Sequence, residues 1–206
     1  MSLAHSSRVR KQRVQSGFTL VEVLITFVIL AIGLLGIVSL QALSKTSQHQ
    51  SIQRSRAVSM ADIMLERIRI NPAGLVAYAT GGSGPLGDGQ ISSEPSPDCV
   101  TAPCDPNDMA DHDLWAWEQL LDGDAATIAG AGTAGLIEPQ GCIIFSAVPG
   151  KLRTGLLSVQ VQWRGLSETT DGVPSGGVAC GGATAGSDAY RRQVTASTFV
   201  LDEAEL

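Results

Sequence analysis

A long apolar run near the N-terminus constrains this chain more than any other feature. Residues 23–40, VLITFVILAIGLLGIVSL, contain only two polar side chains, Thr26 and Ser39. At about 1.5 Å per residue, a helix over this run is about 27 Å long, which is close to the hydrocarbon thickness of a bilayer. The run therefore predicts a helix that can cross a membrane.

A single carboxylate, Glu22, stands immediately before the run. An ionised side chain is costly in hydrocarbon, so a chain that keeps one there usually has a use for it. The plainest interpretation is local: Glu22 lies near the helix N-terminus, where it interacts favourably with the helix dipole and can reach the lipid headgroups. The alternative is a functional role for this carboxylate.

Charge is distributed unevenly around the run. Residues 1–17 contain four basic residues and no acidic residue; the basic residues are Arg8, Arg10, Lys11 and Arg13. Since the chain has 14 basic residues, the remainder carries ten against all 20 acidic residues, a net charge of −10. The positive-inside rule keeps the basic flank in the cytoplasm and places the acidic remainder across the membrane. The remainder contains no basic patch interleaved with aromatic residues, so nucleic-acid binding is not expected.

The N-terminus differs from an ordinary secretory signal peptide. Its apolar run is longer than the usual 7–15 residues, and no A-x-A-like cleavage site follows it. The small residue suited to processing is Gly17, which precedes the run. Cleavage there would remove a basic leader, residues 1–17, and leave the apolar segment on the mature protein.

Beyond the run, the helix is expected to continue into a soluble domain. No proline occurs before Pro72, which predicts one helix from about Phe18 to Ile70. Residues 18–43 form its transmembrane and assembly half, and residues 44–71 form an amphipathic half. In the second half, one apolar stripe recurs at helical spacing and is suited to packing on a domain; it comprises Ala57, Ala61, Met64, Leu65 and Ile68.

The remaining residues, 72–206, are expected to form a periplasmic head of α+β class. Residues 73–107 are rich in Gly, Ser, Pro and Asp and predict a long loop. A short helix is expected over residues 109–121, capped by Asn107 or Asp108. Residues 142–148, 156–163 and 191–201 predict three strands, the first two joined by a hairpin. A small antiparallel sheet covering the apolar stripe of the long helix would complete the head.

Four cysteines, Cys99, Cys104, Cys142 and Cys180, all lie in this head. An even number in an exported domain suggests two disulfides, for which three connectivities are possible. We favour a local Cys99–Cys104 loop and a longer Cys142–Cys180 bridge. A zinc site on the cysteines is disfavoured, because no C-x2-C pair occurs and His112 is the only histidine near them.

The segment SGFTLVEVLITFVILAIGLLG, residues 16–36, resembles the class III signal of type IV prepilins. The resemblance implies that a prepilin peptidase cuts after Gly17 and methylates the new N-terminal residue, Phe18. It also implies that Glu22, the fifth residue of the mature chain, faces the charged amine of Phe18 in a neighbouring subunit of an assembled filament. Such a pair would fix the axial register of the subunits, because leaving either charge unpaired in a low-dielectric bundle is costly.

Later segments are similar to the PilV-type minor pilins: QRSRAVSMADIMLERIRINP, the close cysteine pair, DLWAWEQLL, GCIIF and VQVQWRG. The resemblance implies a type IV pilin-like fold and a subunit that helps to initiate pilus assembly, at the tip, with other minor pilins and the major pilin. It places the chain in the bacterial inner membrane with a periplasmic C-terminal domain, and afterwards in the extracellular pilus. No enzymatic activity, cofactor or metal is expected.

Two other functions remain open. A pseudopilin of a type II secretion system would share the N-terminus, and a signal-anchored periplasmic binding protein or enzyme would use the apolar helix only as a tether. No G-x-S-x-G or H-E-x-x-H motif occurs.

A calcium site in CDPNDMADHD, residues 104–113, is a lesser alternative to helix capping, since the spacing of a calcium-binding loop is missing. Four arginines of the long helix predict a solvated or partner-facing surface: Arg54, Arg56, Arg67 and Arg69.

Overall fold

The computed structural model describes residues 17–80, 85–123, 127–128, 131–132, 135–182 and 186–205. The basic residues of the expected leader precede residue 17 and lie outside the described residues. The chain divides into two compact units, Met1–Lys45 and Thr46–Leu206.

Helix α1 runs from Leu20 to Ile70 and contributes to both units. It begins two residues after the expected Phe18 and ends at the expected residue. In the first unit, the two polar side chains of the apolar run hydrogen-bond within the helix: Thr26 Oγ1 donates to the carbonyl of Val23 at 2.8 Å, and Ser39 Oγ to that of Leu35 at 2.9 Å. Neither hydroxyl hydrogen therefore needs water, which suits a segment placed in hydrocarbon.

In the second unit, the apolar stripe of α1 is buried, as expected. All five members are at most 7% exposed, and Met60, which was not part of the predicted stripe, is also buried. Asn71 follows the last helical residue, and its backbone N–H still donates to the carbonyls of Arg67 and Ile68. Pro72 then begins a 3-10 turn, Pro72–Gly74, followed by the short helix α2, Leu75–Tyr78. The expectation of irregular structure from residue 73 was therefore wrong at its start, because Leu75 and Tyr78 are fully buried and fix this turn of helix on the core.

Helix α3 spans Pro106–Asp122 and is longer than the expected 109–121. Its cap is Asp105, not Asn107 or Asp108: Oδ1 of Asp105 accepts from the backbone N–H groups of both residues, at 2.8 and 2.9 Å. Proline at the first helical position fits this start, since proline has no N–H to leave unpaired there. The helix ends at Gly123, whose φ of 81° suits glycine.

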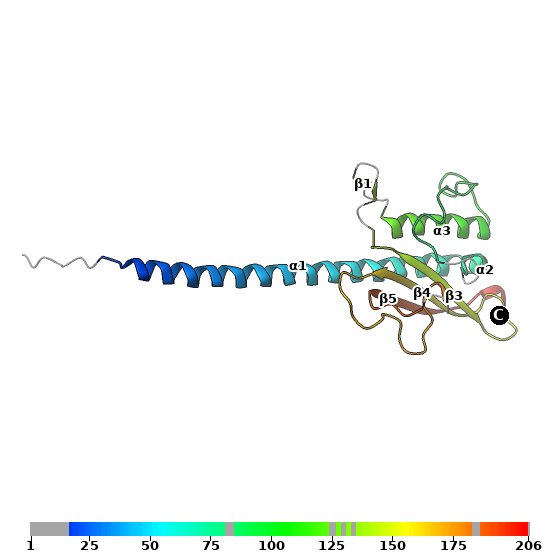
Figure 1. The fold of residues 1–206 in the computed structure, drawn as a ribbon. Helices are drawn as coiled ribbons and strands as arrows, with labels where there is room; N and C mark the ends of the chain where they lie inside the picture. Colours follow the sequence, from blue (N-terminus) through cyan, green and yellow to red (C-terminus); the bar gives the residue numbers. More distant parts are fainter. Residues whose placement is uncertain are drawn as a thin grey trace, which may run out of the picture. The chain divides into compact units, whose positions relative to one another are not determined.

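The sheet of the head consists of β3 (Gln140–Ala147), β4 (Gly155–Arg164) and β5 (Arg191–Val200). The strands are antiparallel in the order β3-β4-β5 (Figure 1). All three expected strands are confirmed to within two residues at each end, and a hairpin joins the first two. Central strand β4 is the most buried, with Leu157, Val159 and Val161 at 0% exposure. A two-residue pair, β1 (Thr127–Ile128) with β2 (Ala131–Gly132), lies between α3 and the sheet in sequence, and a short turn, Glu203–Glu205, ends the chain.

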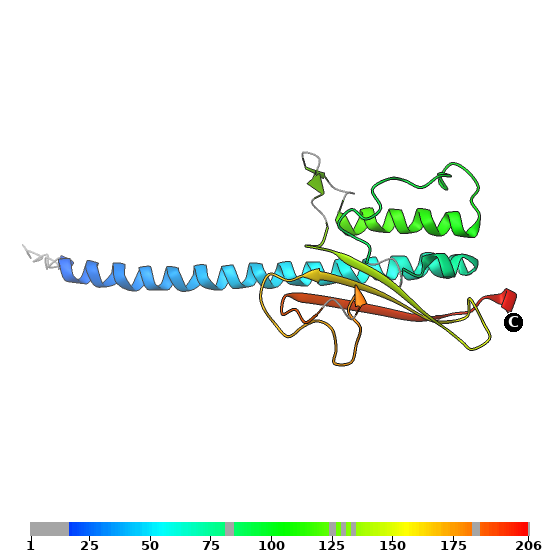
Figure 2. The same ribbon diagram turned by 45° about the vertical axis from the view of Figure 1, so that its right-hand side comes forward.

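Within the head, the C-terminal part of α1 lies between the sheet and α3 (Figures 1 and 2). Trp117 of α3 is 1% exposed, and its Nε1 donates to the carbonyl of Met60 in α1 at 3.0 Å. The first residues of β3 also contact this indole: a Cβ on Gly141 would lie 2.5 Å from the Trp117 ring, so only glycine fits there. The core is therefore formed by α1, α3 and the sheet, and the α+β, type IV pilin-like fold class is confirmed.

Candidate processing and assembly site

The expected cleavage position lies in extended chain ahead of α1. Gly17 and Phe18 precede the helix, and the Phe18 side chain is 82% exposed. Apart from its chain neighbours, no atom of the described residues lies within 4 Å of the position that a Cβ would take on Gly17. The structure therefore leaves this pair of residues accessible from the surface.

Thr19 begins the helix, a role that the interpretation of the sequence above did not assign. The backbone N–H of Glu22 donates to Thr19 Oγ1 at 3.3 Å, which satisfies one of the free N–H groups of the first turn. The sequence Thr19-x-x-Glu22 has the spacing of a capping box, so the motif could have identified this cap. Glu22 thus lies in the first turn, close to the positive end of the helix dipole.

The helix behind this start exposes its apolar side chains on every side. From Phe18 to Leu43, each large apolar side chain is at least 43% exposed. The window of α1 that is apolar and long enough to cross a membrane has no buried residue in the structure. The first unit itself therefore provides no cover for these side chains, and lipid or other apolar helices can supply it.

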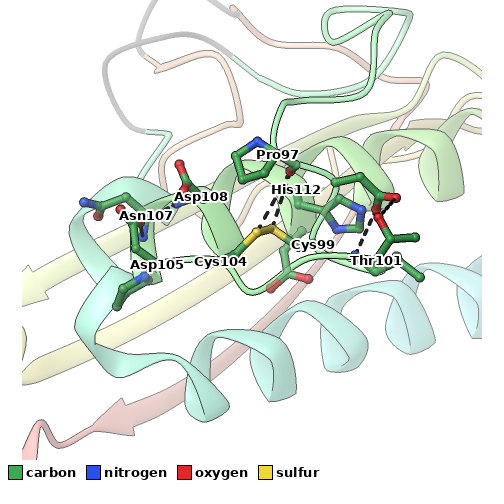
Figure 3. The surroundings of a disulfide bond; sticks show 12 residues. Pro97, Cys99, Thr101, Cys104, Asp105, Asn107, Asp108 and His112 are labelled. Atoms are coloured by element: carbon green, nitrogen blue, oxygen red, sulfur yellow. Dashed lines mark hydrogen bonds between the residues drawn. A yellow bond between two sulfur atoms is a disulfide. The ribbon is translucent and has the colours of Figure 1, made fainter.

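Both disulfides lie in the head. Cys99 and Cys104 are joined just before α3, where the bond closes a tight loop that leads into the helix cap (Figure 3). Cys142 of β3 is joined to Cys180, across a sequence separation of 38 residues. Cys142 and Cys180 are 8% and 1% exposed. This is the pairing favoured above, and it uses all four cysteines.

A polar network connects the end of α1 with α2 and α3. Asp113 accepts from Arg67 Nη1 at 2.8 Å through Oδ1 and from the Tyr78 hydroxyl at 2.5 Å through Oδ2. Burial, together with the hydrogen bond to Asp113, raises the pKa of Tyr78 well above its usual range. Arg67, expected on a solvated or partner-facing surface, is thus half-buried and bound by a carboxylate on another helix. Asn71 Nδ2 extends the network to the carbonyl of Pro106 at 2.7 Å.

Two family models match adjacent parts of the chain. Residues 12–38 match the prokaryotic N-terminal methylation motif, and residues 39–115 match the type IV pilin family described as Tt1218-like. Together the two matches support a pilin subunit. The first match covers Gly17, Phe18 and Glu22, and the second covers the rest of α1, the Cys99–Cys104 loop and the first part of α3. No curated protein and no solved structure gives a significant match.

The match to a pilin family suggests a structural role for this chain. The methylation motif indicates prepilin processing, and the apolar helix with the pilin domain indicates membrane anchoring and a pilus context. The candidate functional site is therefore the first turn of α1 together with the exposed apolar surface that follows it.

Proposed function

We propose that this chain is a minor pilin of the PilV type, which helps to initiate the assembly of a type IV pilus at its tip together with other minor pilins and the major pilin. The observation that carries the proposal is the order of the two matches: a methylation motif over residues 12–38 leads directly into a pilin domain over residues 39–115. The exposed apolar helix between the processing position and the head is what a filament core requires.

Processing takes place at the Gly17–Phe18 bond in this proposal. Prepilin peptidase removes residues 1–17, and the amine of Phe18 becomes the N-terminus and is methylated. The amine keeps its positive charge after methylation. Support comes from the accessible, extended chain at this position and from the small residue before the bond.

Glu22 then acts between subunits. Within one chain, the Thr19 cap already satisfies the N–H of Glu22, and its carboxylate lies on an exposed first turn. When apolar helices of several subunits pack together, the Glu22 carboxylate of one subunit pairs with the Phe18 amine of the next. Loss of one partner leaves a charge unpaired in a low-dielectric environment, which is strongly destabilising. The pair therefore selects one axial register.

The proposal also fixes the topology of the precursor. The leader, residues 1–17, stays in the cytoplasm, residues 18–43 cross the inner membrane, and residues 44–206 reach the periplasm. Two disulfides in the head suit an oxidising compartment. After assembly, the processed chain is part of the extracellular pilus.

Mass spectrometry of the N-terminus tests the processing step. The mature wild-type chain should begin at a methylated Phe18, and Gly17→Leu should retain residues 1–17. Gly33→Ala is a matched control, because Gly33 lies within α1 and a Cβ there meets no atom within 4 Å. Wild-type protein that keeps its leader in cells with normal pili would refute the proposal.

Co-purification tests the role of Glu22. Glu22→Gln should be processed and inserted into the membrane normally, yet should recover fewer pilin partners than wild type after crosslinking. Glu66→Gln, which removes an exposed carboxylate of the head, is the control. Equal recovery of partners by wild type and Glu22→Gln would show that the carboxylate does not pair with another subunit.

Deletion of the gene distinguishes a pilus subunit from a pseudopilin. Deletion should reduce surface pili, whereas a defect in protein secretion with normal pili would indicate a pseudopilin instead.

A further inference from the structure

Three side chains with metal-binding atoms converge beside the Cys99–Cys104 disulfide. Glu94 and Asp98 belong to the loop before the disulfide, and His112 belongs to α3. One ligand atom from each residue lies within 4.8 Å of the other two. Figure 3 shows His112 close to the disulfide and directed toward the turn that contains Thr101.

His112 is the observation that points to a ligand. The residue is only 9% exposed, and its Nε2 atom is inaccessible and makes no hydrogen bond within the described part of the chain. The nearest carboxylate oxygen is Oε1 of Glu94 at 3.6 Å, which is too long for a hydrogen bond. A buried polar nitrogen without a partner is rare in native proteins, because losing its contact with water costs free energy.

The surroundings hold two of the three side chains in place. Oδ1 of Asp98 accepts from the backbone N–H of Val100 at 2.9 Å, and Oδ2 from the Thr101 hydroxyl at 2.8 Å. Each Asp98 oxygen accepts one of these hydrogen bonds and keeps a second lone pair for a cation. His112 is held by α3, while Glu94 is an exposed side chain that can turn toward a bound ion.

We propose that Glu94, Asp98 and His112 bind a divalent transition-metal ion, for which Zn²⁺ is the best fit. One imidazole nitrogen and two carboxylate oxygens are a ligand set that zinc accepts. Zinc bonds of 2.0–2.2 Å put tetrahedral ligand atoms about 3.3–3.6 Å apart, and the 3.6 Å between His112 Nε2 and Glu94 Oε1 fits that range. A ligand atom of Asp98 lies within 4.8 Å of the other two residues and would move closer on binding. A water or a group from another subunit would take the fourth position. This site departs from the expectation that the chain binds no metal, and it uses no cysteine.

Calcium fits these residues less well. Calcium prefers six to eight oxygen ligands, and here one of three ligands is nitrogen. The acidic run 104–113, considered above for calcium, has its first carboxylate engaged elsewhere, since Asp105 caps α3. A zinc ion would cross-link the loop that carries Glu94 and Asp98 to α3. This inference does not depend on the proposed role in pilus assembly.

Isothermal titration of the full chain in detergent tests the site directly. After removal of metal with a chelator, Zn²⁺ should bind at one site per chain and raise the Tm of the head, whereas Mg²⁺ and Ca²⁺ should give no saturable heat. His112→Gln should abolish this binding. Glu94→Gln, at an exposed side chain that does not affect folding of the core, should weaken it at least about tenfold. His49→Gln is the matched control, because His49 is an exposed histidine of α1.

Several outcomes would overturn the proposal. These are the absence of saturable zinc binding by the wild-type chain, equal binding by wild type and Glu94→Gln, and loss of binding in His49→Gln. X-ray absorption of the zinc-loaded chain should show only nitrogen and oxygen ligands. Sulfur in the coordination shell would place the metal on reduced cysteines and would also overturn the proposal.

Discussion

The two parts of helix α1 are built from the same kind of backbone but obtain their stability from different sources. In residues 18–43, apolar side chains point in every direction and remain exposed; Ile29, for example, is 64% exposed. In residues 46–70, one apolar stripe is buried, and its residue Ile68 is 0% exposed. The second part is covered by the chain's own sheet and by α3, whereas the first part needs lipid or other subunits.

This difference teaches that an apolar side chain in a pilin-like helix can have two separate functions. Those of the head part stabilise the fold of one chain. In the proposed function, those of the N-terminal part contribute to membrane insertion and assembly, so substitutions there should leave the stability of the head unchanged. The following predictions test that separation, beginning with the largest expected loss of stability.

Substitution of isoleucine by alanine in each part gives the sharpest contrast. Ile68→Ala should lower the free energy of unfolding of the head by about 2–5 kcal/mol, because it opens a cavity in the core. Ile29→Ala should change it by less than about 0.5 kcal/mol. Tryptophan fluorescence during urea denaturation in detergent measures the head alone, since all three tryptophans, Trp115, Trp117 and Trp163, lie in it. A similar loss in both variants would contradict the separation.

The two disulfides should differ in their contributions to the head. Chain-entropy arguments give about 4 kcal/mol for a bridge across 38 residues and about 2 kcal/mol for one across five, as for Cys142–Cys180 and Cys99–Cys104. The double serine variant of Cys142 and Cys180 should therefore have a lower urea midpoint than the double serine variant of Cys99 and Cys104. A larger loss from the Cys99–Cys104 variant would show that the small loop stabilises the native state beyond its entropy.

The cap of α3 should contribute about 1 kcal/mol to the stability of the head. Asp105→Ala removes the oxygen that accepts from two backbone N–H groups and should lower the free energy of unfolding by about 1 kcal/mol. Asn107→Ala is the control: its side chain is exposed and does not act as the cap, so little change is expected. A larger loss from Asn107→Ala in thermal unfolding would refute this assignment of the cap.

Replacement of Glu118, whose carboxyl group lies in the core, is expected to stabilise the head. Glu118 is 0% exposed, and neither of its oxygens makes a hydrogen bond of normal geometry within the described residues. Burial is the main cause that raises the pKa of Glu118, against the influence of nearby backbone N–H groups such as that of Ile91. Because the folded state then prefers the protonated form, stability is greatest below the ordinary pKa of about 4.3 and is lost as the pH rises through the raised value.

Glu118→Gln should therefore raise the Tm at pH 7 and leave it nearly unchanged at pH 4. The measurement is the Tm of both proteins from pH 4 to pH 8, where the wild-type curve should fall relative to that of the variant. Asp122→Asn is a useful comparison, since its carboxylate is already bound by the N–H groups of Asp88 and Gly89. Parallel curves for wild type and Glu118→Gln would show that Glu118 is ionised in the folded head.

Local pattern alone determined most elements of this protein. The apolar run, the absence of proline before Pro72 and the stripe ending at Ile68 predicted α1 and its buried face, and alternation with β-branched residues predicted the three strands. The helix and the strands depend on residues a few positions apart, so periodicity is sufficient to detect them. The methylation motif that a family model matches was instead expected from the resemblance of residues 16–36 to prepilin signals.

Tertiary structure alone decided how distant side chains meet. Folding placed Asp113 beside Arg67, which was expected on a solvated or partner-facing surface, and it buried Glu118, for which the sequence contained no signal. Folding also brought Glu94 and Asp98 near His112. The first helix residues past Pro72 were missed because contacts with the core, and not local propensity, hold them. Contacts of this kind join residues separated by long stretches of chain, and no periodic pattern in the sequence encodes such a separation.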